Sequence, residues 1–277
     1  MANITAADVN KLRQITGAGM MDCKNALVES EGDIDRAIDN LRKKGQKVAN
    51  KRADKEATEG CVIGKVSSDN KRGVVVAVNC ETDFVAKNEE FRAFTENVAD
   101  IILNNNISDI ETLKQQKIGN ITVGDRINEL IGKIAEKIEI SRFESMEADY
   151  VTFYNHNGNK ITALIGFNKN VNNIGQVGKD LAMQIAAMSP IAIDKEDVSQ
   201  DTINREIEIA KEQIKLEGKS EEMAEKIAIG KLNKFFNENT LLNQEFIKDN
   251  KKTIRQYLQE TNNELKVVKF FRVQIGG

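Results

Sequence analysis

Residues 73–88 read Gly-Val-Val-Val-Ala-Val-Asn-Cys-Glu-Thr-Asp-Phe-Val-Ala-Lys-Asn. The run from Gly73 to Val78 is rich in β-branched residues, which predicts a buried strand. The residues that follow it place large apolar side chains at helical spacings of three and four, namely Phe91, Phe94, Val98, Ile101 and Ile102. The stretch therefore predicts a strand-to-helix junction that carries a carboxylate and a large ring, Asp83 and Phe84.

A structural role explains this junction as readily as a functional one. Thr82 or Asp83 could cap the following helix, and Phe84 could staple its first turn. Capping turns are far commoner than functional turns. The residues of the junction alone therefore favour the structural interpretation.

The composition indicates a protein of about two domains, because domains usually run to about 100–200 residues and the chain has 277. Its 40 basic and 43 acidic residues give a formal net charge of −3. Such a mixed surface argues against a protein that coats nucleic acid. Aromatic residues make up 5% of the chain and Trp is absent, which weakens the case for a base-stacking platform.

The cysteines and the N-terminal sequence indicate a reduced, cytoplasmic protein. Cys23, Cys61 and Cys80 show neither disulfide nor metal-site spacing and are expected to be small buried hydrophobes. The first residues lack the basic and apolar regions of a leader, and no apolar run reaches the ~18 residues of a membrane span. We therefore expect a soluble cytosolic chain.

Residues 5–45 are predicted to form three short helices. Thr5 and Asp8 resemble a capping box, Asp33 is a good N-cap for the third helix, and Gly45 is expected to end it. The first helix is expected to bury Val9, Leu12 and Ile15. Three helices in about 40 residues are close to the lower limit for an independent core, so we expect docking rather than chemistry.

Basic residues are concentrated in residues 42–55. Such a run can contact phosphates, but it is more often a solvated linker or an exposed helix face. We place the first domain boundary here. The expected units are residues 1–55 (docking module and linker), 56–147 (core subdomain 1) and 148–277 (core subdomain 2).

The two core units are predicted to repeat one α+β arrangement. Strands at 60–66 and 73–78 precede one helix, and strands at 150–154 and 160–167 precede another. Between them we expect a helix over 125–137 and a strand near 138–143. The chain is expected to close with a helix over 253–258 and a strand over 265–275.

Residues 200–236 are predicted to form an antiparallel helical hairpin inserted in the second unit. Apolar residues recur at spacings of four and three in both halves, and Leu216 to Ser220 is the expected turn. A seam of such small residues buries little surface, which favours an interaction arm without chemistry.

No catalytic set can be assembled from this sequence. The single histidine, His156, lies in the polar turn 155–159 with no nucleophile placed beside it. One histidine and three scattered cysteines make no metal site, and no phosphate-binding loop is present. We therefore expect neither an enzyme nor a bound cofactor or metal.

The chain resembles bacterial elongation factor Ts, the nucleotide-exchange factor of elongation factor Tu. Residues 4–27 resemble the family's N-terminal signature almost residue for residue, and residues 78–87 resemble its second signature. The order of a three-helix module, a basic linker, a duplicated core and an inserted hairpin also fits. The resemblance covers essentially all 277 positions.

The resemblance implies roles for particular residues. The segment that intrudes near the partner's magnesium and phosphate site corresponds to Thr82, Asp83, Phe84 and Val85. The expected partner-binding residues are Leu12, Met20, Met21, His156 and Ile254. It also implies that the N-terminal module is similar to ubiquitin-associated folds, and that the partner is GDP-bound or nucleotide-free elongation factor Tu, with no membrane and no direct nucleic acid.

The sequence departs from the family at two places. Ala135 and Lys137 stand where the family often has Gly and Asn, which puts a contact role of that loop in doubt. The chain ends at Gly277, whereas longer members continue into a C-terminal helical module. Two other functions are compatible with the residues alone: an adaptor that binds peptides or helices through its helical module, and an RNA-binding protein that uses residues 42–55.

Overall fold

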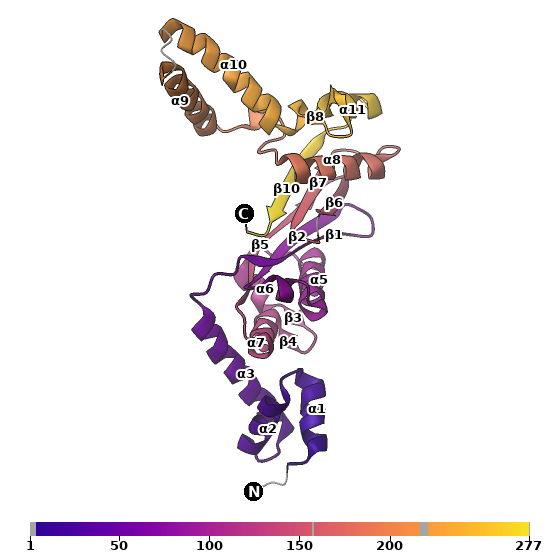
Figure 1. The fold of residues 1–277 in the computed structure, drawn as a ribbon. Coiled ribbons are helices and arrows are strands. Elements are labelled where there is room, and N and C mark those ends of the chain that lie inside the picture. The colour runs from indigo at the N-terminus through magenta and orange to yellow at the C-terminus, as the bar shows by residue number, and fades with distance from the viewer. Residues whose placement is uncertain (1–3, 157, 217–220, 277) are drawn as a thin grey trace.

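The computed structural model describes residues 4–156, 158–216 and 221–276. Figure 1 shows an elongated molecule with three helices at the N-terminal end, strands in the middle and a pair of helices at the far end. The predicted mixed helix and sheet class is confirmed. Among the described helices, none is both long and apolar enough to cross a membrane.

The N-terminal module consists of α1 (Ala6–Thr16), α2 (Met20–Glu29) and α3 (Ile34–Arg52). Thr5 and Asp8 form the capping box of α1, and Asp33 caps α3. The module has its own small core, made chiefly of Val9, Leu12, Cys23, Ala26, Leu27 and Ala37. Ile15 does not join it, although it was predicted on the buried face of α1. Its side chain is 54% exposed, because it lies in the last turn of α1, where the helix leaves the other two.

The prediction that α3 ends at Gly45 is wrong, since the helix continues to Arg52. Gly45 lies where α3 crosses α7 (Val123–Ile134), and a Cβ there would come within 2.4 Å of the Asn128 carbonyl oxygen. Gly132 faces Gly45 from α7. A side chain at either position would separate the helices, so this glycine serves close packing rather than helix termination.

The first core unit is a three-stranded antiparallel sheet covered by a helix. Its strands are β1 (Glu59–Val66), β2 (Arg72–Cys80) and β5 (Ile138–Glu147), in the order β1-β2-β5. The helix is α5 (Glu89–Asn104), which packs on the sheet through Phe91, Phe94, Val98 and Ile102. Between α5 and β5 the chain forms α6 (Ile110–Gln115), β3 (Lys117–Ile118), β4 (Ile121–Thr122) and α7.

The second core unit repeats this arrangement. Its sheet contains β6 (Tyr150–His156), β7 (Ile161–Phe167) and β10 (Val267–Gln274), with β7 in the middle, and α8 (Ile174–Met188) covers it. Each unit also has a short strand pair followed by a helix with a capping box. In the first unit these are β3, β4 and α7; in the second they are β8 (Glu245–Phe246), β9 (Asp249–Thr253) and α11 (Ile254–Thr261).

The two sheets pack against each other, so β2 is buried on both faces. Val74, Val76 and Val78 contact the helical side of the first unit, whereas Val75 and Ala77 contact the second sheet. Burial on both faces produces a continuous β-branched run instead of an alternating one. This explains the pattern of residues 73–78.

The second unit carries an insertion of two helices, α9 (Gln200–Leu216) and α10 (Glu221–Asn239), flanked by the 3₁₀ turns η1 (Lys195–Asp197) and η2 (Leu241–Asn243). In Figure 1 the two helices lie side by side at the end of the molecule opposite α1–α3. The buried part of their described seam consists of Ala210, Ile214 and Ala228. Residues 217–220 of the predicted turn lie outside the described residues.

Candidate functional site

The segment Thr82–Val85 lies between β2 and α5, at the end of the buried strand. It forms most of a single helical turn, α4 (Asp83–Ala86), and α5 starts after it with Asn88 as the N-cap. Thr82 caps α4, because its Oγ1 accepts a hydrogen bond from the Val85 backbone N–H at 3.4 Å. The prediction that Thr82 or Asp83 caps the helix over residues 89–103 is wrong, because Asn88 caps α5 and Thr82 caps the separate turn α4.

Phe84 projects from this turn into solvent. Its side chain is 81% exposed, whereas Ala86 is buried and Val85 packs partly against the core of the first unit. Exposing a phenylalanine forfeits about 1.5–3 kcal/mol of burial energy, so packing does not account for this residue. The staple interpretation is therefore wrong.

Asp83 presents a charged carboxylate beside this ring. Lys87 donates to its Oδ2 at 2.7 Å, and this hydrogen bond and charge hold the pKa of Asp83 below its ordinary value, with a further contribution from Lys160. Because pairing lowers the pKa of this carboxyl group, the ion pair with Lys87 is present at neutral pH. It is lost as the pH falls through the lowered pKa.

Two half-buried glutamates, Glu136 and Glu81, hold the segment in place. Glu136, in the turn between α7 and β5, accepts hydrogen bonds from both the backbone N–H and the hydroxyl of Thr82, at 3.0 and 2.7 Å. Glu81 accepts from Arg52 at 2.8 and 3.1 Å and from the Lys137 backbone N–H at 2.6 Å. The Cys80 thiol donates to the Thr82 carbonyl at 3.2 Å, and burial raises its pKa to about 12, so it remains a donor.

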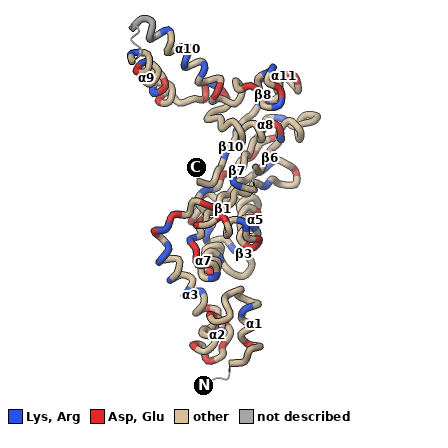
Figure 2. The backbone as a smooth tube through the Cα atoms, viewed as in Figure 1, with Lys and Arg blue, Asp and Glu red and all other residues tan. Residues whose placement is uncertain are grey.

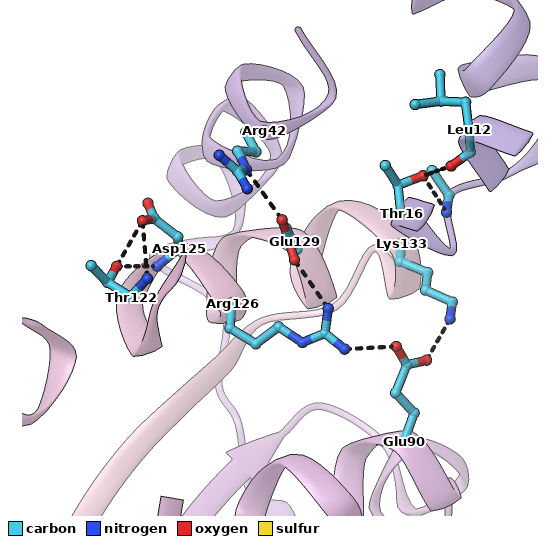
Figure 3. A network of polar contacts seen from close by, with 10 residues as sticks. Leu12, Thr16, Arg42, Glu90, Thr122, Asp125, Arg126, Glu129 and Lys133 are labelled. Carbon is cyan, nitrogen blue, oxygen red and sulfur yellow. Dashed lines mark hydrogen bonds and ion pairs between the residues drawn. The ribbon is translucent and has the colours of Figure 1, made fainter. Parts of the chain in front are cut away.

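A second set of ion pairs joins α3, α7 and α5. Figure 3 shows Arg42 of α3 and Arg126 of α7 on either side of Glu129, at 3.2 and 3.0 Å. Arg126 and Lys133 then both contact Glu90 in the first turn of α5. The N-terminal module is therefore connected by charged side chains to the helix that follows Thr82–Val85.

The N-terminal module exposes part of its predicted partner-binding surface. Met20 and Met21, at the start of α2, are 56% and 64% exposed. Ile15 and Val28 are also exposed apolar side chains of this module, and sequence reasoning did not select them as contacts. Leu12 is fully buried in the module core, so its assignment as a direct partner contact is wrong.

The other two predicted partner contacts also differ in exposure: His156 is exposed, whereas Ile254 is buried. His156 is exposed at the last position of β6 rather than in the predicted turn, and its Nδ1 lies 3.1 Å from the Tyr154 hydroxyl. Ile254, the first residue of α11, is fully buried in the core of the second unit. The prediction of a direct partner contact is therefore wrong for Ile254, because its side chain closes the core beneath α11.

The structure brings the His156 end of the second sheet close to the Thr82–Val85 end of the first. Lys160, which precedes β7, donates to Glu59 of β1 at 2.8 Å and contributes to lowering the Asp83 pKa. Glu59 pairs with Cys80 in the first sheet. Both predicted contact regions of the core therefore lie at one end of the paired sheets.

Several side chains of the basic run at residues 42–55 take part in ion pairs within the chain. Figure 2 shows Lys and Arg interspersed with Asp and Glu along the described chain. Within the basic run, Arg42 and Arg52 pair with Glu129 and Glu81, and Lys44 pairs with Asp22. In residues 4–156, 158–216 and 221–276, no cluster of three or more His, Cys, Asp or Glu side chains could hold a metal ion.

Glu136, Glu81 and Arg52 were not among the residues predicted for the site. Their partners are far away in the sequence, and the carboxylates and guanidinium carry no local pattern that distinguishes them from surface charges. Ala135 ends α7 in a left-handed turn with a φ of 62°, which the sequence does not indicate, because alanine rarely adopts a positive φ.

Comparisons with known proteins identify the relatives of the chain. The family model described as Elongation factor TS matches residues 81–277. Curated proteins named Elongation factor Ts from Christiangramia forsetii and Flavobacterium psychrophilum are 52% and 51% identical over 276 residues, which cover 100% of each chain. The Elongation factor Ts of Porphyromonas gingivalis is 44% identical over 272 residues and 97% of each chain.

Proposed function

Since this chain belongs to the elongation factor Ts family of translation nucleotide-exchange factors, we propose that it releases GDP from elongation factor Tu through the Thr82–Val85 segment. In this proposal it binds the GDP-loaded partner in the cytoplasm and disfavours the bound Mg²⁺ and nucleotide. GTP then occupies the emptied site. The protein changes a binding equilibrium and its rate, and makes or breaks no covalent bond.

The observation that carries this proposal is the exposure of Phe84 on an anchored turn. The ring is 81% exposed while the backbone beneath it is held by Glu136 and by the Cys80 thiol. An apolar group on a turn that is already ordered can enter a partner without the cost of ordering that turn first. Next to it, the ionised Asp83 offers negative charge, which is unfavourable beside phosphate oxygens and attractive to Mg²⁺.

Burial of the Phe84 ring alone does not provide enough free energy for a large weakening of GDP binding. Each tenfold weakening of GDP binding needs about 1.4 kcal/mol of differential interaction, and burying Phe84 provides about 1.5–3 kcal/mol. The ring therefore accounts for roughly one to two decades. The coupling is reciprocal, so GDP weakens the binding of the factor by the same ratio.

Larger effects need separate surfaces that hold the partner. We assign this role to Met20 and Met21 of the N-terminal module, which we take to be ubiquitin-associated-like, and to His156 of the second unit. All three side chains are exposed. No direct nucleic-acid contact is part of the proposal, because Arg42, Lys44 and Arg52 are used in ion pairs within the chain.

The test is release of a fluorescent GDP from elongation factor Tu, followed by stopped flow with excess unlabelled nucleotide. Substoichiometric amounts of this protein are expected to release all of the labelled GDP, because each molecule acts repeatedly. An unchanged release rate would overturn the proposal and favour the adaptor function. Release that requires an equimolar amount would also contradict it.

A further inference from the structure

We propose that Glu136 is a positioning residue for nucleotide release: it fixes the turn that presents Asp83 and Phe84 and connects this turn to the N-terminal module. The inference rests on the proposed function, since it concerns how the same segment is kept in a working geometry. Glu136 lies in the short connection between α7 and β5, 54 residues from its partner Thr82.

The first step of the argument is the contact between Glu136 and Thr82. The carboxylate uses both oxygens, one for the Thr82 backbone N–H and one for its hydroxyl, at 3.0 and 2.7 Å. Because the hydroxyl hydrogen points to Glu136, the lone pairs of Oγ1 face the Val85 N–H that they cap. Hydrogen bonds to an ionised acceptor are about twice as strong as neutral ones. One carboxylate thus fixes both the position of Thr82 and the orientation of its cap.

The second step concerns the exposed residues that depend on this cap. Asp83 and Phe84 occupy the first two positions of α4, which is only four residues long. So short a helix has little stability of its own, so its direction is set by the groups that hold its ends. Phe84 itself makes almost no contact with the rest of the chain. The ring therefore points where Thr82 and the partly buried Val85 direct it.

The third step is the connection to the N-terminal module. The backbone N–H of Lys137, next to Glu136, donates to Glu81, and Arg52 at the end of α3 donates to both oxygens of the same carboxylate. The turn at residues 135–137 therefore holds Glu81 and Thr82 together. Since α3 also packs on α7 at Gly45 and Gly132, this turn, α3 and α7 act as one body.

On the other side of the turn, the series of ion pairs in Figure 3 runs from Arg42 of α3 through Glu129 and Arg126 to Glu90 in the first turn of α5. Thr82–Val85 thus lies between two connections to α3, one before it in the sequence and one after it. A partner bound to the N-terminal module would be held at a defined distance and angle from Phe84.

The consequence is a separation of binding and release. Glu136 is half-buried behind the turn, so it is not expected to contribute binding contacts to a partner. Replacing it by Gln keeps its shape but places an amide N–H₂ group against one of the two donors of Thr82. If the amide oxygen stays on the Thr82 N–H, the N–H₂ group donates to Oγ1 and the hydroxyl must rotate. The Val85 N–H then shares the lone pairs of Oγ1 with the amide, the cap is weakened, and the bound complex reaches the geometry that releases GDP less often.

The experiment compares Glu136→Gln with Glu139→Gln in the stopped-flow release assay, with the factor varied to saturation. Glu139 lies three residues away and is partly exposed, and its carboxylate forms an ion pair with the Lys137 side chain at 3.2 Å. For Glu136→Gln we expect the release rate at saturation to fall about tenfold, the change that corresponds to about 1.4 kcal/mol, with the half-saturating concentration unchanged. Glu139→Gln is expected to match the wild type.

Hydrogen exchange distinguishes positioning from a general loss of structure. Hydrogen exchange of the Thr82 and Val85 amides is expected to speed up in Glu136→Gln while amides of β2 stay protected. A globally faster exchange in Glu136→Gln would contradict a local positioning role.

The outcomes separate this inference from the proposed function. If the wild type releases no GDP, the proposed function fails, and the inference fails with it. If the wild type is active and Glu136→Gln has the same saturated rate, only the inference is overturned. A raised half-saturating concentration with an unchanged saturated rate would make Glu136 a binding contact and would also overturn it.

Discussion

At the scale of single residues, Phe84 can be changed without disturbing the fold. Its ring is 81% exposed and its turn is held by contacts of Thr82, Val85 and Ala86. Phe84→Ala is therefore expected to leave the free energy of unfolding within about 0.5 kcal/mol of the wild type. The saturated rate of GDP release is expected to fall about tenfold or more, because the ring provides about 1.5–3 kcal/mol where it enters the partner. Stopped-flow release and urea unfolding measure the two effects.

The matched comparison is Met20→Ala together with Met21→Ala. These exposed side chains are assigned to holding the partner, so their loss is expected to raise the half-saturating concentration while the saturated rate stays close to the wild type. If Phe84→Ala and the double variant lost rate and affinity in equal proportion, this division between release and docking would be wrong.

The sequence alone did not predict which large apolar side chains are exposed and which are buried. Leu12, Met20 and Phe84 are all large and apolar, and the sequence resemblance assigned all three to the partner surface. Only packing decides between them: Leu12 lies between three helices, whereas Met20 and Phe84 occupy helix starts that face solvent. Ile254 was misassigned for the same reason, since it starts α11 but points into the core.

At the scale of elements, the contact between α3 and α7 holds the N-terminal module against the core. Gly45→Ala is expected to destabilise the protein by about 1–3 kcal/mol, because its Cβ would lie 2.4 Å from the Asn128 carbonyl oxygen and the backbones would have to separate. Urea unfolding measures the change. Gly230→Ala in α10 is the control: its Cβ would meet no described atom within 4 Å, and we expect stabilisation by about 0.5–1 kcal/mol.

A Gly45→Ala protein as stable as Gly230→Ala would show that α3 and α7 are not closely packed in solution. The sequence could not distinguish these two glycines. Both lie in helical patterns, and a glycine near a polar stretch predicts a helix end. The contact that keeps Gly45 inside α3 comes from α7, about 80 residues later in the chain.

The strands were predicted more reliably than the helix ends. The β-branched run of β2 and its turn at Ser67 to Asn70 are local signals, and the pairing of β1 with β2 follows from them. The third strand of each sheet is different. Many residues separate β5 and β10 from the strands that they pair with. Nothing in their sequences indicates which strand each of them joins.

At the scale of the whole molecule, the two inserted helices have a seam of their own, apart from the cores of the two units. Two buried side chains of α8 hold the chain that follows the insertion: Gln184 contacts Gln244 and the backbone at Glu245 and Ile247, and Asp180 contacts Lys248 and Tyr257. Gln244 in turn donates to the Glu238 backbone carbonyl near the end of α10 at 2.8 Å. These contacts fix the base of α9 and α10 without using their seam. The seam itself, around Ala210, Ile214 and Ala228, shares no residue with the cores of the two units.

We therefore expect GDP release to survive replacement of residues 203–235 by a Gly/Ser linker of about six residues, which is flexible enough to rejoin the base. Both the saturated rate and the half-saturating concentration are expected to match the wild type, because α9 and α10 lie at the end of the molecule opposite α1–α3 (Figure 1). The thermal midpoint of the remaining core is also expected to persist, since the anchoring contacts of Gln184 and Asp180 are kept. A lower saturated rate with an unchanged midpoint would show that this arm takes part in release, and would overturn the assignment of release to the Thr82–Val85 end alone.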